Sequence, residues 1–242
     1  NVIFSVIPDS DTDSIPLKLK STKTSGIIAI GRFNLTNLQS LMSINVPLVL
    51  VDSHHLHMNV DEVSTNNYEG CYQATKLLIE KGHRKISFVG SVYYSVSFKE
   101  RYRGYCDCIS EYSNMDIQTK DIIGNHDSLT VPFNSSDFKN TIPEIFKPSA
   151  IVCANDPTAI MLYDLLQTKS LVIPDDISII GFDNVEKCDW VNPKLSSIDS
   201  DISSLGKIAA DLLTRRISNP DGRKEKILVE TSLIDRFSVR KY

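Results

Sequence analysis

The sequence lacks any run of about 18 apolar residues, the length that a helix needs to cross a bilayer. Its start also lacks the basic segment followed by an apolar one that is typical of a signal peptide. The chain also lacks an excess of positive charge, since its 26 Lys and Arg are outnumbered by 30 Asp and Glu, which gives a formal net charge of −4. Since nucleic acid is bound through clustered Lys and Arg, we expect this stretch neither to grip DNA by itself nor to enter a membrane.

Cysteine is sparse and odd in number, with five residues scattered through 242. Disulfide frameworks favour even numbers of cysteines in small secreted domains. The sequence therefore predicts reduced thiols that pack as small apolar side chains, and a cytoplasmic location. The five are Cys71, Cys106, Cys108, Cys153 and Cys188.

Common catalytic signatures are absent as well. The chain has no G-x-S-x-G elbow, no G-x-x-x-x-G-K-[ST] phosphate loop and no G-x-G-x-x-G turn. Asp9, Asp11 and Asp13 imitate the start of a calcium loop. However, Ser14 and Lys20 stand where that loop needs glycine and glutamate, so a loop at the end of a strand is the better interpretation.

Three histidines close together raise the possibility of a metal site. His54, His55 and His57 follow a predicted strand, but no cysteine or HExxH partner accompanies them, so solvated loop side chains are the simpler interpretation. Cys106 and Cys108 point to different faces of a helical stretch and make a poor chelating or redox pair. We therefore expect no metal, no cofactor and no enzymatic activity.

What the sequence does contain is an alternation of short apolar runs with helical stretches. Such runs are typical of parallel strands buried on both faces, and strands that alternate with helices predict a doubly wound α/β fold. The predicted strands are residues 27–30, 47–51, 86–89, 150–153 and 177–180.

The predicted helices have recognisable ends. Asn66 can cap one helix, and Gly82 follows its last turn. Residues 155–157 supply polar cap residues and then a proline, which the first helical turn tolerates. A third helix starts at Ser203 or Ser204 and carries a single apolar face.

Polar side chains follow several of these strands. Asp52, Asn155 and Asp183 each come just after a strand, and the loop after residue 90 leads to Ser97 and Arg101. In open parallel sheets, ligands bind beyond the carboxyl ends of the strands. Carboxylates, an amide and a planar guanidinium suit neighbouring hydroxyl groups, so the pattern predicts a polyhydroxyl ligand such as a sugar.

Each of these residues also has a simpler interpretation. An Asp or Asn after a strand is commonly a helix cap or a turn former, and for Asp156 the cap is the interpretation that we favour. The lone Trp190 is better explained as an anchor in the core or in a dimer interface than as a ligand contact. It is the convergence of Asp52, Arg101, Asn155 and Asp183 that favours a binding site.

Five groups of motifs also carry a family resemblance. They read N-x-x-G…A…L…G-H-x-x-I, R-x-x-G-[YW], A-N-D, I-P-x-D-[IV]-S-[IV]-[IV]-G-[FY]-D-[DN] and P-x-L-[ST]-[ST]-[IV]. In order and spacing, over residues 26–237, they resemble the effector-binding core of LacI/GalR-type transcriptional regulators. They fall at residues 67–86, 101–105, 153–156, 173–184 and 193–198.

The resemblance implies a fold of the type I periplasmic-binding-protein kind, with two doubly wound α/β lobes and a ligand cleft between them. It implies the sensing core of a bacterial repressor, in which a small molecule, more often a sugar than a purine, modulates operator DNA binding. DNA would be bound as a homodimer through a separate N-terminal helix-turn-helix. An extracytoplasmic sugar-binding protein of a transporter is the first alternative, and an enzyme with Asp52 or Asp183 as general base is the second.

The resemblance also implies which residues bind the effector. Asp52, Arg101, Asn155 and Asp183 match family positions that contact it, and Ser97 and Ser200 are weaker candidates. Ile202 departs from the aromatic side chain that is usual in the family. Either His126 or Phe133 could supply an aromatic wall instead.

By the same analogy, residues 1–65 and 199–222 form the N-terminal lobe, and residues 66–198 and 223–242 form the C-terminal lobe. Residues 1–7 look like the family's second strand, so we expect its first strand and following helix to be missing from this stretch.

Overall fold

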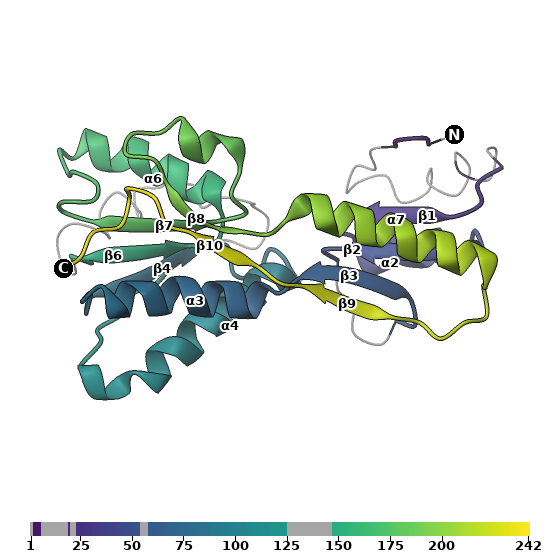
Figure 1. Ribbon diagram of the computed structural model, residues 1–242, viewed down its shortest axis with the longest axis horizontal. Helices are drawn as coiled ribbons and strands as arrows, with labels where there is room; N and C mark the ends of the chain where they lie inside the picture. The colour runs from purple at the N-terminus through teal and green to yellow at the C-terminus, as the bar shows by residue number, and fades with distance from the viewer. Residues whose placement is uncertain (1, 6–18, 20–22, 54–57, 125–146) are drawn as a thin grey trace. The chain divides into compact units, whose positions relative to one another are not determined.

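The computed structural model describes residues 2–5, 19, 23–53, 58–124 and 147–242. The chain divides into two compact units, one of Asn1–Ser64 and Ile202–Val229 and the other of Thr65–Asp201 and Glu230–Tyr242. This division differs from the predicted lobes at residue 65 and at residues 199–201, which fall in the second unit, and at residues 223–229, which fall in the first. The reason for the last difference is that strand β9 (Lys226–Val229) hydrogen-bonds beside β3 (Asp61–Thr65) in the sheet of the first unit (Figure 1).

The second unit is built on a six-stranded sheet of order β10-β8-β7-β6-β4-β5. Every neighbouring pair is parallel except β10 and β8, which are antiparallel. The strands are β4 (Ile86–Gly90), β5 (Ile122–Ile123), β6 (Ala150–Cys153), β7 (Ser178–Phe182), β8 (Ser196–Asp199) and β10 (Ser232–Ile234).

Helices cover both faces of this sheet (Figure 1). Phe88 and Ile180 pack into one apolar cluster with α3 (Asn67–Glu80) and α4 (Val96–Glu111). Alternate residues such as Ile179 pack into a second cluster with α6 (Asp156–Thr168). This two-sided burial explains the uninterrupted apolar runs of the strands. The described part of this unit also contains two 3₁₀ turns, η1 (Ser113–Met115) and η2 (Glu186–Asp189).

The caps predicted at Asn66 and Asn155 form. The Asn66 side chain accepts a hydrogen bond from the backbone N–H of Glu69 at 3.4 Å, at the start of α3. Gly82 follows the end of that helix with a φ of +100°, a conformation that glycine adopts at little cost. Asn155 caps α6, and Pro157 occupies its first turn.

The first unit has a four-stranded sheet of order β1-β2-β3-β9, and its described helices also cover both faces. Leu48 and Leu50 pack with α2 (Leu35–Met42), whereas Val49 and Val51 pack with α7 (Ile202–Ser218). The remaining strands are β1 (Ile27–Ile30) and β2 (Leu48–Val51), which pair in parallel, as do β2 and β3. Helix α7 begins at Ile202, one residue before Ser203 and two before Ser204, the two predicted starts.

Two features of the first unit differ from expectation. Residues 2–5 form no strand, and the side chains of Val2, Ile3 and Phe4 are exposed, so this apolar run does not pack as a strand would. Strand β3 is present although its sequence begins with Asp61 and Glu62. Both carboxylates are buried and paired, so the strand has no apolar pattern that a sequence could show.

No helix formed by the described residues is long and apolar enough to cross a membrane. The five cysteines are unpaired, and all except Cys106 are buried. Burial raises the pKa of the Cys71 thiol to about 12, so this thiol stays protonated at neutral pH.

Candidate functional site

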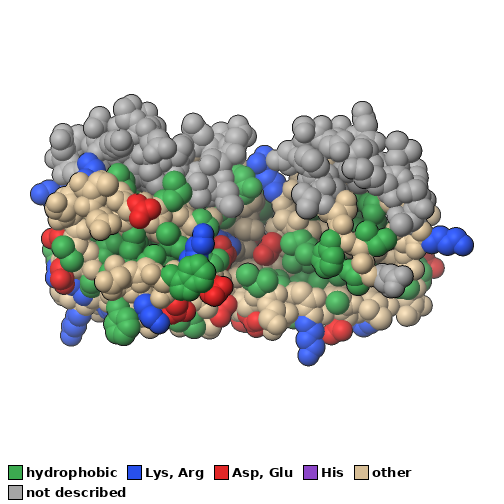
Figure 2. Space-filling model, turned by 90° about the horizontal axis from the view of Figure 1, so that it is seen from above, with side chains coloured by type: hydrophobic (Ala, Val, Ile, Leu, Met, Phe, Trp, Pro, Cys, Tyr) green, Lys and Arg blue, Asp and Glu red, His purple; other side chains and the backbone are tan. Residues whose placement is uncertain are grey.

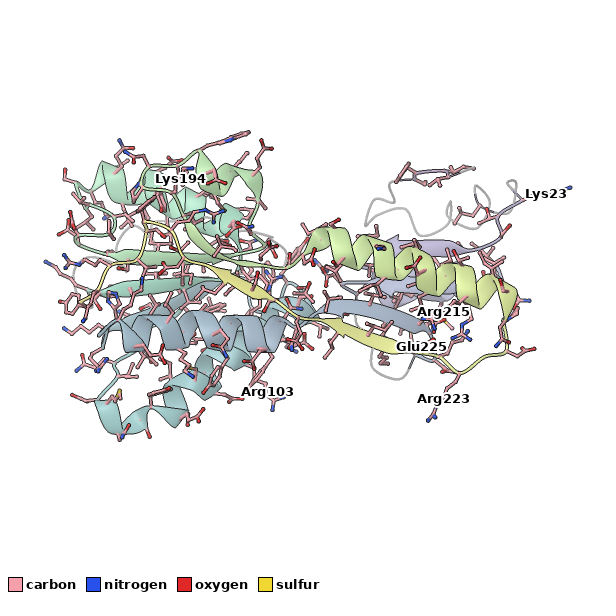
Figure 3. The ribbon with its side chains drawn as sticks, in the orientation of Figure 1. Lys23, Arg103, Lys194, Arg215, Arg223 and Glu225 are labelled. Atoms are coloured by element: carbon pink, nitrogen blue, oxygen red, sulfur yellow. The ribbon has the colours of Figure 1, made fainter. Side chains whose placement is uncertain are left out.

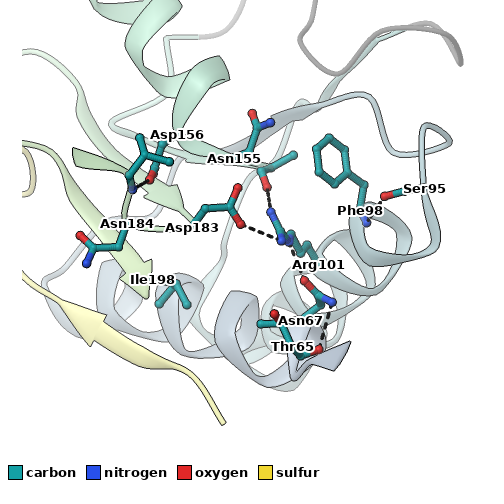
Figure 4. Close-up of polar contacts among 12 residues, drawn as sticks. Thr65, Asn67, Ser95, Phe98, Arg101, Asn155, Asp156, Asp183, Asn184 and Ile198 are labelled. Carbon is teal, nitrogen blue, oxygen red and sulfur yellow. Dashed lines mark hydrogen bonds and ion pairs between the residues drawn. The ribbon is translucent and has the colours of Figure 1, made fainter. Parts of the chain in front are cut away.

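Arg101 on α4 is the centre of a polar cluster at the carboxyl ends of the strands of the second unit (Figure 4). Its Nε donates to Asn67 Oδ1 at 2.8 Å, and its Nη1 donates to the carbonyl oxygen of Ala154 at 2.7 Å. Its Nη2 donates to Asp183 Oδ1 at 2.9 Å. A guanidinium carries five N–H groups, so these three contacts leave two further N–H groups that can donate to a ligand.

Aromatic rings hold the plane of this guanidinium. The Arg101 carbon Cζ lies 3.7 Å from the centroid of the Phe182 ring and 5.3 Å from that of Phe98. Phe98 is placed by the start of its helix, where Ser95 Oγ accepts a hydrogen bond from the Phe98 backbone N–H at 3.2 Å. Hydrogen bonds in the plane and rings against it fix the guanidinium before any ligand arrives.

The glycine of the R-x-x-G motif explains how α4 comes close enough to α3 for this contact. A Cβ on Gly104 would lie 2.2 Å from the carbonyl oxygen of Tyr68, so only glycine allows the two helices to approach this closely. Asn67, one residue before Tyr68, is held in turn because its Nδ2 donates to the Thr65 carbonyl oxygen at 3.0 Å. The sequence signal for Asn67 was the first letter of N-x-x-G, but its role in orienting Arg101 was not predicted.

Asp183 follows β7 and presents its carboxylate to Arg101. Its backbone N–H donates to the Ile198 carbonyl oxygen at 2.8 Å, and its φ is +100°. The side chain is 26% exposed, whereas the side chain of Arg101 is 5% exposed. The pair is therefore open to solvent on the side of the carboxylate.

The structure gives Asn155, not Asp156, the role of the helix cap, and the effector contact of Asn155 stays a prediction. Asn155 is the helix cap, because its Oδ1 accepts a hydrogen bond from the Thr158 backbone N–H at 3.0 Å. The cap interpretation of Asp156 was wrong, since this residue is the first of α6 and its carboxylate turns toward the loop after β7. Burial raises the pKa of Asp156 to about 6.

The other predicted contacts fall in different places. Ser97 lies in the first turn of α4, and Ser200 is buried between β8 and α7. Asp52 follows β2 with a φ of +49°. It belongs to the first unit and Arg101 to the second, and their convergence on one ligand stays a prediction. Ile202 is exposed at the start of α7.

Trp190 is exposed, so the prediction of a core anchor was wrong, and its place in a dimer interface stays a prediction.

Some of the residues named above lie outside the part of the chain that the structure describes. They are His126, Phe133, the three calcium-like aspartates and the three loop histidines.

Comparison with known proteins decides the family. A model of the periplasmic binding protein-like domain matches residues 75–239. The chain belongs to this family. The ribose operon repressor of Haemophilus influenzae is 31% identical over 199 residues, which cover 82% of this chain and 59% of that protein. The repressor PurR of Mannheimia succiniciproducens is 30% identical over 197 residues, which cover 81% of this chain and 58% of that protein.

A solved structure agrees with these relatives. The LacI family regulator from Enterococcus faecalis V583, with bound ribose, superposes with a TM-score of 0.77 at 28% identity, over 93% of this chain and 81% of that one. The resemblance to a LacI/GalR effector-binding core is thus confirmed, as is the periplasmic-binding-protein-like fold. The chain spans less than two thirds of the length of the curated relatives.

Proposed function

We propose that this chain is the effector-sensing core of a LacI/GalR-type transcriptional repressor and that its effector is a sugar. The observation that carries the proposal is the pre-oriented Arg101, which meets Asp183 at 2.9 Å beyond the end of β7 and has two N–H groups left over. A sugar hydroxyl both donates and accepts, so a carboxylate beside a guanidinium can engage two neighbouring hydroxyls at once.

The sugars bound in related solved structures favour a sugar over a purine. One relative is a ribose operon repressor, and a solved regulator at 28% identity holds ribose. A regulator from Alkaliphilus metalliredigens, at 25% identity and a TM-score of 0.76, holds D-xylulofuranose. The purine alternative is kept in the test below because several relatives at about this identity are named PurR.

The sugar would act as a switch by binding two arrangements of the lobes with different affinities, because equal affinity shifts no equilibrium. In this proposal Arg101, Asn155 and Asp183 bind from one lobe and Asp52 binds from the other, with smaller contributions from Ser97 and Ser200. The switch would reach operator DNA through a separate N-terminal domain of a cytoplasmic homodimer. On the face of the molecule drawn in Figure 2, the described Lys and Arg side chains are scattered among acidic and apolar ones and do not gather into a basic patch.

The alternatives are a sugar-binding protein of a transporter and an enzyme. The curated relatives named above are repressors, which favours a regulator over a transporter and over an enzyme. An enzyme would need to turn over its bound sugar, and loss of that turnover on changing Asp52 or Asp183 would support it.

A thermal-shift screen of sugars, sugar phosphates and purines tests the proposal. A ligand at about 100 times its Kd stabilises the folded state by about 2.7 kcal/mol, so its effector should raise the melting temperature clearly. We expect a pentose such as D-ribose among the active compounds. A screen in which no sugar raises the melting temperature and a purine does would replace the sugar with a purine, and a screen without any active compound would contradict an effector core.

A further inference from the structure

Asp156 is a fully buried carboxylate that accepts three hydrogen bonds, all from elements beyond its own helix. Its Oδ2 accepts from the backbone N–H of Val185 at 2.8 Å and from the thiol of Cys188 at 3.1 Å. Its Oδ1 accepts from the hydroxyl of Ser197 at 2.7 Å. The carboxylate thereby joins the start of α6 to β8 and to the loop that carries Asp183. Figure 4 shows Asp156 beside that loop.

That loop has a backbone which needs such support. Asp183 and Asn184 have φ values of +100° and +52°, a region that side chains other than glycine rarely adopt. The Asn184 backbone N–H donates to Ser197 Oγ at 3.1 Å, and the same hydroxyl donates to Asp156. Two successive amides after Asp183 therefore depend on Asp156, one directly and one through Ser197.

Strand β7 is shaped to admit this carboxylate. A Cβ on Gly181 would lie 2.0 Å from Asp156 Oδ1, so any other residue would push the carboxylate away. Gly181 is the glycine of the G-[FY]-D motif, two residues before Asp183. The same short stretch of chain thus makes room for Asp156 and presents the ligand-binding aspartate.

We propose that Asp156 is a positioning residue, which holds the loop after β7 so that Asp183 faces Arg101 and the effector. The proposal rests on the proposed function, because positioning matters only if Asp183 binds a ligand. Asp156 also lies close in sequence to the residue that holds Arg101, so one short segment supports both Arg101 and Asp183. Ala154 accepts from Arg101, and Asp156, two residues later, fixes the loop of the partner aspartate.

The surroundings of Asp156 make its protonation, and with it the order of the loop, depend on pH. Burial, with a smaller contribution from the nearby Asp183 carboxylate, raises its pKa to about 6, although the hydrogen bonds from Ser197, Val185 and Cys188 lower it. Cys188 stays a neutral thiol because burial raises its pKa, and Arg236 binds Asn184 Oδ1 at 2.8 Å from the C-terminal segment. Burial by itself favours the protonated acid, but the hydrogen bonds from the loop and from Ser197 lower the pKa and therefore favour the carboxylate. Protonation weakens these bonds, so loop order and sugar affinity should both fall below about pH 6.

Amide hydrogen exchange tests the positioning role without any ligand. In Asp156→Asn, the Asn184 and Val185 amides should exchange about tenfold faster than in the wild type or more. The amide side chain keeps only one of the two oxygens that accept from Val185 and from Ser197, so one support of the loop is lost and the other is weakened. Asp121→Asn is the matched control. Asp121 also accepts three hydrogen bonds, from the Phe88 backbone N–H and from the hydroxyls of Tyr102 and Tyr105, and it does not touch this loop.

Unchanged exchange at Asn184 and Val185 in Asp156→Asn would overturn the proposal, as would an equal rise in Asp121→Asn. If Asp156→Asn does not fold, Ser197→Ala decides. Exchange should then rise at Asn184 while Val185 stays protected, and equal protection of both amides would contradict the chain of contacts.

Calorimetric titration with D-ribose separates this proposal from the one on which it rests. Wild-type affinity should fall several-fold between about pH 7.5 and about pH 5, while Asp156→Asn should bind weakly and equally at both. An identical pH profile in the two proteins would overturn the positioning role. If the wild type does not bind D-ribose, the result counts against the sugar, and the amide exchange alone decides on Asp156.

Discussion

Each unit of the molecule contains a buried arginine–aspartate pair, and the two pairs differ in how completely they are closed. In the first unit, Arg216 meets both carboxylate oxygens of Asp61, with Nε at 2.7 Å and Nη2 at 2.9 Å. In the second unit, Arg101 meets one oxygen of Asp183 at 2.9 Å. The Asp61 side chain is 0% exposed, whereas that of Asp183 is 26% exposed.

The neighbours of each pair explain the difference. Asp61 also accepts from the backbone N–H of Glu225 at 2.9 Å, and Arg216 also donates to the carbonyl oxygen of Arg223 at 2.6 Å. These contacts tie β3 to the turn before β9. Asp183 instead stands in a loop past the end of a strand, where a ligand can reach its carboxylate. A closed pair holds the fold, and a half-open pair is suited to binding.

Removal of Arg216 should have the largest effect on stability. Arg216→Ala leaves the buried Asp61 carboxylate without its main partner, which typically costs about 3–5 kcal/mol of unfolding free energy. Urea denaturation followed by circular dichroism measures this. A loss below about 1 kcal/mol would show that the pair is not the closed element described here.

Removal of Arg101 should act mainly on ligand binding. Arg101→Ala should weaken the effector by about 2–5 kcal/mol, by analogy with a buried charged pair that loses one partner. Titration calorimetry with the sugar found by thermal shift measures the change. Unchanged affinity would remove Arg101 from the site.

Asp183→Asn should separate binding from stability. The amide keeps the shape of the side chain and loses its charge, so the effector should bind about 1–3 kcal/mol more weakly. Because Asp183 is partly exposed, the unfolding free energy should change by about 1 kcal/mol or less. Asp61→Asn should have the opposite pattern, with a clear loss of unfolding free energy and unchanged effector affinity at the site in the other unit. If both variants lose stability equally, the contrast between the pairs is wrong.

The smallest effect on stability is expected for Arg215, the neighbour in sequence of Arg216. Arg215 lies beside Arg216 in sequence and pairs with Glu225 at 3.1 Å, but both side chains are exposed (Figure 3). Arg215→Ala should therefore change the unfolding free energy by about 0.5 kcal/mol or less, because solvent screens such pairs. The same urea experiment checks it, and a loss as large as that of Arg216→Ala would contradict burial as the cause.

The sequence predicted the parts of this comparison that depend on local patterns. Continuous apolar runs gave β1, β4 and β6, and the polar residue after β7 gave Asp183. The closed pair was not predictable, because Asp61 and its partner Arg216 lie 155 residues apart and strand β3 shows charge where a strand normally shows apolar residues. The role of Asp156 was hidden in the same way, since its partners come from later in the chain. For Trp190 the core alternative was wrong, because the exposure of a side chain depends on packing that no local pattern records.

A crystal structure of the chain with D-ribose tests the central claim most directly. The account predicts sugar hydroxyl oxygens about 2.7–3.2 Å from the Arg101 guanidinium and within the same distance of the Asp183 carboxylate, while the Arg216–Asp61 pair stays unchanged. A sugar bound elsewhere, with no contact to Arg101 or Asp183, would contradict it.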